Sequence, residues 1–133
     1  MKLSRTAAHA VLAVAYLAEC DRQVPVQARQ IAGHLAIPTD SALKILQALS
    51  RQRLIRSQLG RGGGYRLDED PRKLSLLRIV EAVDGPVQVQ LPLSDAAPAA
   101  SRQAVKRLRY ACRDATRRLR EDFDRITVAQ LVA

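Results

Sequence analysis

Residues 38–67 read PTDSALKILQALSRQRLIRSQLGRGGGYRL, and this stretch decides the fold. It opens with a helix start signal, Pro38-Thr39-Asp40, after which apolar residues recur at helical spacing to about Gln52. One face of the predicted helix therefore packs inward, while the opposite face is polar and exposed. The polar face carries Asp40, Lys44, Gln47 and Arg51.

The second half of the same stretch predicts a β-hairpin. Residues 54–58 are typical of a strand, residues 60–64 of a tight glycine turn, and residues 65–67 of the return strand. Glycine in such a turn tolerates positive φ and permits close approach to a phosphate backbone.

Two helices are predicted before this stretch, and a further short helix is predicted directly after it. Residues 4–20 form a helix capped by Ser4, and residues 26–35 form a short helix joined to the next one by a turn of about four residues. That pair fits a helix-turn-helix, and the hairpin that follows fits its wing. Residues 74–83 form a further helix, capped by Ser75 and ended by a Gly-Pro pair. We therefore expect a mainly α fold in which residues 1–86 are a winged helix-turn-helix DNA-binding domain.

Residues 101–133 are expected to form a long helix and a C-terminal tail, after a connecting loop at residues 87–100. The helix ends near Arg125, and Thr127 caps a final short turn. A helix of about 25 residues is roughly 37 Å long. One small head cannot easily bury it, although packing within one chain is the alternative. A second copy would bury its apolar seam and supply two-fold symmetry. This predicted dimerisation seam consists of Val105, Leu108, Cys112, Ala115, Leu119 and Ile126, flanked by Phe123.

The charge of the chain favours a polyanionic partner. Lys and Arg total 22 against 13 Asp and Glu, which gives a net charge of +9. Residues 51–66 hold five arginines and no acid, and a second basic run from Arg102 to Arg120 is opposed only by Asp114. Such clusters bind nucleic acid by releasing counterions, although a solvated face is an equal alternative for the second run. Aromatic residues make up only 3%, which disfavours proteins that stack single-stranded bases.

Other classes of protein find little support in the sequence. No apolar run is long enough to cross a membrane, and the first residues do not fit a secretory signal, so we expect a cytoplasmic protein. Cys20 and Cys112 are too few for a disulfide framework, and with two histidines they give no zinc spacing, so no metal or cofactor is predicted. No paired carboxylates, phosphate loop or Cys/His arrangement indicates an enzyme.

Three segments resemble the IscR/NsrR-type (Rrf) family of bacterial winged helix-turn-helix transcription regulators. They are residues 62–67 (GGGYRL), residues 75–86 (SLLRIVEAVDGP) and residues 126–132 (ITVAQLV). The resemblance covers nearly the whole chain. It implies a nucleoid-associated homodimer that binds palindromic operators on double-stranded DNA, usually as a repressor. In many members it also implies an iron–sulfur cluster on three cysteines between the helix after the wing and the long helix.

The chain departs from the family pattern at three places. Residues 87–111 contain no cysteine, and Cys112 lies inside the helical seam, so we expect a member that lacks the cluster. The recognition helix has Ser41-Ala42-Leu43 where many relatives have Tyr-Leu-Glu. The wing has Leu59-Gly60-Arg61 where Arg-Gly-Pro is common. The operator of a relative is therefore not expected to transfer.

The first turns of the recognition helix are expected to meet base edges. The candidates are Thr39, Asp40, Ser41 and Lys44, with Gln47 one turn further. Lys44 suits guanine and Gln47 adenine, while Asp40 suits cytosine. The alternative for Asp40 and Lys44 is a surface pair four residues apart. Arg61 is expected in a narrow minor groove. The remaining predicted DNA contacts are Arg51, Arg56 and Arg66 on phosphates, Gly62, Gly63 and Tyr65 in the wing, and more weakly Ser4 and Arg5.

Cys112 is the single candidate for a redox sensor. Near a dimer axis, with Arg109 and Arg113 close in sequence, its thiolate would be stabilised and therefore oxidisable; a small apolar filler is the alternative. The leading hypothesis is a dimeric transcription regulator, and its competitor is an architectural or non-specific DNA-binding or interaction protein. A regulator prefers one palindrome over random DNA by at least about a thousandfold, whereas an architectural protein binds both nearly equally.

Overall fold

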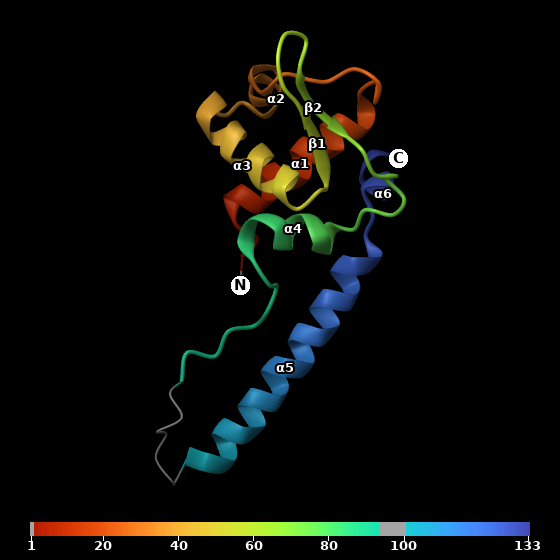
Figure 1. Cartoon of the computed structure of the whole chain (residues 1–133). Coiled ribbons are helices and arrows are strands. Elements are labelled where there is room, and N and C mark those ends of the chain that lie inside the picture. Colours follow the sequence, from red (N-terminus) through yellow and green to blue (C-terminus); the bar gives the residue numbers. More distant parts are fainter. Residues whose placement is uncertain (1, 94–100) are drawn as a thin grey trace.

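The computed structural model describes residues 2–93 and 101–133, which form a head and one projecting helix (Figure 1). The head contains α1 (Arg5–Glu19), α2 (Ala28–Leu35), α3 (Thr39–Arg51), the strands β1 (Ile55–Gln58) and β2 (Gly64–Leu67), and α4 (Leu76–Asp84). The projecting helix is α5 (Arg102–Arg125), after which the short α6 (Val128–Val132) lies back against the head. The predicted fold class, mainly α with a two-stranded wing and a long C-terminal helix, is confirmed.

The core of the head is apolar and lies between the helices and the base of the wing. Helix α3 contributes the face that its spacing predicts, with Ala42, Ile45, Leu46 and Leu49 buried. Its polar residues Asp40, Lys44, Gln47 and Arg51 are all exposed. Other fully buried side chains come from every part of the head, among them Leu17, Ile31, Leu54, Leu67, Leu74 and Ile79.

Two residues in the left-handed region set the direction of the chain on either side of α3. Ala36, with φ 56°, caps the C-terminus of α2 and is the first of the three residues, 36–38, that separate α2 from α3. Arg53, with φ 62°, follows α3 and donates its backbone N–H to the Ser50 carbonyl, while Leu54 donates to the Leu49 carbonyl. These two bonds form a Schellman ending, which satisfies carbonyls that the helix leaves free. The ending turns the chain directly into β1.

The predicted start of the second helix at residue 26 is wrong. Val26 is extended instead and exchanges two backbone hydrogen bonds with Tyr65 of β2, each 2.8 Å long. Helix α2 begins two residues later, at Ala28. The pairing partner lies far away in the sequence, so local periodicity gave no sign of it.

Helix α6 packs into the head rather than continuing α5. The predicted Thr127 cap is confirmed, and Gln130 completes a capping box with it. Val128 is fully buried, and its N–H donates to the Leu74 carbonyl at 2.9 Å. Because the Leu76 N–H also donates to the Ile126 carbonyl, at 2.8 Å, the end of α5 is attached to the start of α4. The division into residues 1–86, 87–100 and 101–133 remains a prediction, and these contacts add α6 to the core of the head.

Residues 87–93 run from α4 alongside α5, and Glu81 holds the three parts together (Figure 1). Its carboxylate pairs with the Arg120 guanidinium and accepts the Val87 N–H at 2.8 Å. Burial raises the pKa of Glu81, but these two donors outweigh it and hold the pKa below its ordinary value. Val89 adds a second attachment by donating its N–H to Thr116 Oγ1 at 2.8 Å. Residues 94–100 of the predicted connecting loop lie outside the described residues.

Candidate nucleic-acid interface

The outer face of α3 presents every residue that the sequence selects for base contact. Thr39, Asp40, Ser41, Lys44 and Gln47 are exposed, as is Arg51 at the end of the helix. Among the described residues, Asp40 and Lys44 form no ion pair with each other. The alternative of a simple surface pair is therefore not seen, and the first two turns of α3 present their polar groups to solvent.

The wing places its arginines on both strands of the hairpin. The register sets Arg56 directly opposite Arg66, and Arg56 also forms an ion pair with Asp68 at 3.0 Å. Arg61 is exposed at the tip, between two glycines of positive φ, Gly60 and Gly62. Gly63 has a structural duty, because a Cβ there would lie 2.1 Å from the Gln58 carbonyl oxygen.

Tyr65 and Arg66 are both half-buried, unlike the exposed Arg56 and Arg61. The Tyr65 side chain is half-buried against the core, and its backbone forms the bridge to Val26. The Nε of Arg66 is buried and has no hydrogen-bond partner among the described residues. Arg66 lines a small hollow at the base of the wing together with Arg22 and Asp68. Tyr65 therefore supports the hairpin through its bridge to Val26, and both residues remain predicted DNA contacts.

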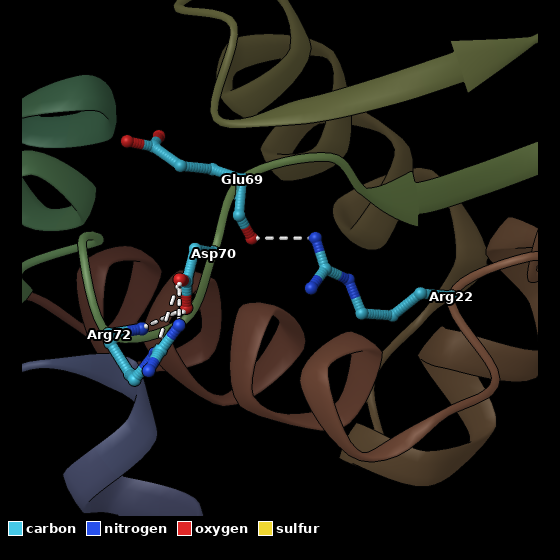
Figure 2. Close-up of polar contacts among 4 residues, drawn as sticks. All are labelled: Arg22, Glu69, Asp70 and Arg72. Atoms are coloured by element: carbon cyan, nitrogen blue, oxygen red, sulfur yellow. Dashed lines mark hydrogen bonds and ion pairs between the residues drawn. The ribbon is translucent and has the colours of Figure 1, made fainter.

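The segment that leaves the wing is held by two further arginines (Figure 2). The Arg22 guanidinium donates to the Glu69 carbonyl at 3.0 Å. Asp70 accepts from both the side chain and the backbone N–H of Arg72, and these bonds lower the pKa of the Asp70 carboxyl to about 2. The segment is thereby attached to the end of α1 and to its own turn, which orients β2.

A groove of about 750 Å³ lies beside α3, and it brings together residues that the sequence keeps apart. Arg5, Thr6 and His9 of α1 line it with Ser41 and Lys44 of α3. Arg5 is a weak candidate from sequence, and the sequence reasoning missed Thr6 and His9. No local signal identifies them, because α1 and α3 become neighbours only in the folded head. Ser4 has another task, since its hydroxyl donates to Asp84 Oδ1 at 2.8 Å and accepts the Ala7 N–H.

The predicted seam of α5 divides into two parts. Leu119 and Phe123 line a hollow of about 460 Å³ with Leu3 and Val80, so the C-terminal end of the seam faces the head. Further from the head, Leu108 is 45% exposed and no residue of α5 is fully buried. The remaining seam residues are half-buried: Val105, Cys112 and Ala115 on α5, and Ile126, which caps the C-terminus of α5.

The cysteines do not fit a three-cysteine cluster. Cys112 lies in the middle of α5 and lines a hollow with Arg109, Arg113 and residues 88–92, whereas Cys20 ends α1. The whole sequence has no third cysteine. Within residues 2–93 and 101–133, no group of three His, Cys, Asp or Glu side chains is placed to hold a metal ion. In the same residues, no helix combines the length and the hydropathy needed to cross a bilayer.

A helix pair with an exposed polar second helix, followed by a two-stranded basic wing, defines a winged helix-turn-helix protein. The model of the Rrf2 family, described as an iron-dependent transcriptional regulator, matches residues 3–133. The chain belongs to this family.

Curated relatives agree with that assignment, and a solved structure agrees with the fold. The chain is 31% identical to the transcriptional repressor NsrR of Streptomyces coelicolor over 113 residues, which are 85% of this chain and 75% of that protein. It is 41% identical to BadM of Rhodopseudomonas palustris over 81 residues, 60% of this chain and 51% of BadM. It spans about half the length of the first curated relatives it matches. The structure of CymR, the global cysteine regulator of B. subtilis, has the same fold, with a TM-score of 0.76 at 20% identity over 99% of this chain and 96% of CymR.

Proposed function

We propose that the chain is a homodimeric, sequence-specific DNA-binding transcription regulator that acts as a repressor. The observation that carries the proposal is the exposed polar face of α3, which lies beside a basic wing while the opposite face of α3 is buried in the core. The relative NsrR is named a transcriptional repressor, and this name supports repression rather than activation. Such a protein works on chromosomal DNA, in the bacterial cytoplasm.

The dimer is supported by the length and exposure of α5. Its 24 residues extend about 36 Å, and most of that length projects beyond the head (Figure 1). Within the described residues, Leu108 of the apolar seam remains 45% exposed. A second copy would cover it and place two heads about a two-fold axis. A palindromic operator with half-sites about one helical turn apart, or a multiple of it, matches that symmetry.

We further propose regulation without an iron–sulfur cluster, although the family model is described as iron-dependent. A single chain with two cysteines, one on α1 and one on α5, cannot supply three cysteine ligands. Visible absorbance of freshly purified protein tests this point, because a cysteine-ligated cluster would give a band there. Oxidation of Cys112 remains the alternative signal that the chain itself offers, and it is half-buried beside Arg109 and Arg113.

The residues of the interface divide by role. Lys44, exposed in the second turn of α3, is the proposed contact to a guanine edge. Arg56 is a proposed phosphate contact, and it exchanges its ion pair with Asp68 for a phosphate oxygen on binding. Arg61 at the wing tip is the proposed minor-groove contact.

Selection of bound duplexes from a random DNA pool, with the full chain as bait, tests the proposal. A regulator yields one palindrome that binds at least about a thousandfold more tightly than random DNA. Lys44→Ala should weaken binding to that palindrome more than to random DNA, whereas Arg56→Ala should weaken both about equally. Identical profiles for the two variants would remove the division of roles, and nearly equal affinity of the wild type for all sequences would favour an architectural protein.

A further inference from the structure

The polar groups that line the groove beside α3 are all basic groups or hydroxyls. Its basic groups are Arg5, His9 and Lys44, its hydroxyls are Thr6 and Ser41, and its other lining residues are apolar. Among the described residues that line it, none is a carboxylate. Arg5, Thr6, Ser41 and Lys44 are exposed, so their polar groups are available to a partner that approaches from solvent.

The position of the groove decides which part of a DNA duplex reaches it. An α-helix with its side chains is about 10–12 Å across, and the major groove of B-DNA is about 12 Å wide. When α3 fills the major groove, the residues beside it lie over the sugar–phosphate strands that border the groove. The wing borders α3 on one side, and the first turns of α1 border it at this groove.

We propose that the groove between α1 and α3 seats a phosphodiester of the bound DNA strand, with Arg5 and Thr6 of α1 as donors and Lys44 reaching from α3 to the adjacent base. This inference rests on the proposed function, and it makes α1 a third DNA-binding element in addition to α3 and the wing. The chemistry matches, because arginine and hydroxyl groups are the usual donors to phosphate oxygens.

Helix α4 fixes the position of the first turn of α1 in this interface. Ser4, the residue before Arg5, caps α1 and donates its hydroxyl to Asp84 at the end of α4, at 2.8 Å. Through that bond, Asp84 of α4 orients the first turn of α1. Arg5 and Thr6 are therefore presented from a fixed helix start.

Phosphate contact predicts a specific salt dependence for Arg5→Gln. The slope of log K against log salt is negative, and each lost phosphate contact makes it shallower by about 0.9. Two copies in a dimer should therefore make it shallower by about 2. Affinity should fall by roughly tenfold at low salt for the selected palindrome and for random duplex alike. Arg102→Gln removes one positive charge from the start of α5, at the far end from the head, and serves as the matched control (Figure 1).

The strand position is found by replacing single phosphates of the duplex with neutral methylphosphonates. At the seated phosphate, the replacement should weaken wild type but leave Arg5→Gln almost unchanged, because the contact is already missing. If Arg5→Gln behaves like Arg102→Gln, or if no methylphosphonate position suppresses its effect, the inference is overturned.

The assay on random duplex separates this inference from the proposed function. Phosphate contacts are independent of sequence. If the wild type shows no operator preference, the proposed function fails, but Arg5→Gln can still make the salt slope shallower. If the wild type prefers one operator and Arg5→Gln leaves the salt slope unaltered, only the inference fails.

Discussion

Replacing Gly64 with alanine tests the junction where the wing joins the entrance to α2. Gly64 has φ +153°, and a Cβ on it would lie 2.5 Å from the Val26 carbonyl oxygen. That oxygen belongs to the backbone and accepts the Tyr65 N–H, so it cannot turn aside as a flexible side chain would. The alanine variant must therefore open the bridge between Val26 and Tyr65 or distort β2.

The expected cost follows from these contacts. A non-glycine residue at this backbone conformation costs about 1–2 kcal/mol. The two bridging hydrogen bonds, each 2.8 Å long, contribute about 1 kcal/mol apiece. Gly64→Ala should thus lower the free energy of unfolding by about 3 kcal/mol, which is a large fraction of the stability of a small domain.

Gly33→Ala is the matched control, and it should change stability in the opposite direction. Gly33 lies within α2, its φ is ordinary, and a Cβ there meets nothing within 4 Å. Alanine in a helix interior is better than glycine by about 0.8–1.0 kcal/mol, so this variant should be more stable than wild type.

Urea unfolding followed by far-ultraviolet circular dichroism measures both variants, at one fixed protein concentration because a dimer gains stability with concentration. The midpoint should fall for Gly64→Ala and rise for Gly33→Ala. A Gly64→Ala midpoint equal to that of wild type would refute the reasoning, because the bridge would then place no steric demand on residue 64.

Three further outcomes are expected. Arg72→Gln should raise the pKa of Asp70 from about 2 toward its ordinary 3.8, as measured by NMR titration of the carboxyl carbon. Since the folded pKa is depressed, the contribution of Asp70 to stability is present above its ordinary pKa and is lost as pH falls toward 2. Arg120→Gln should reduce the free energy of unfolding by on the order of 1 kcal/mol at neutral pH and by less in acid, where Glu81 is protonated and the pair is already lost. An effect that does not depend on pH would contradict the pairing. Val128→Ala should cost about 2 kcal/mol in urea unfolding, because it opens a cavity in the head; a neutral result would detach α6 from the core.

Sequence periodicity was sufficient for most of the elements because their signals are local. The buried and exposed faces of α3, the caps at Ser4, Ser75 and Thr127, and the glycine turn of the wing all depend on residues within one or two turns of each other. The same local signals, taken with the basic residues near the wing, were enough to predict the winged helix and a nucleic-acid partner.

Contacts between distant residues decided what the sequence could not. Val26 is extended because Tyr65 pairs with it, and Val128 is buried because the chain returns to Leu74 after α5. The groove that joins Arg5 to Lys44 exists for the same reason, since α1 and α3 become neighbours only when their apolar faces share one core. Periodicity identifies the apolar face of each helix. It does not say which other helix packs against that face.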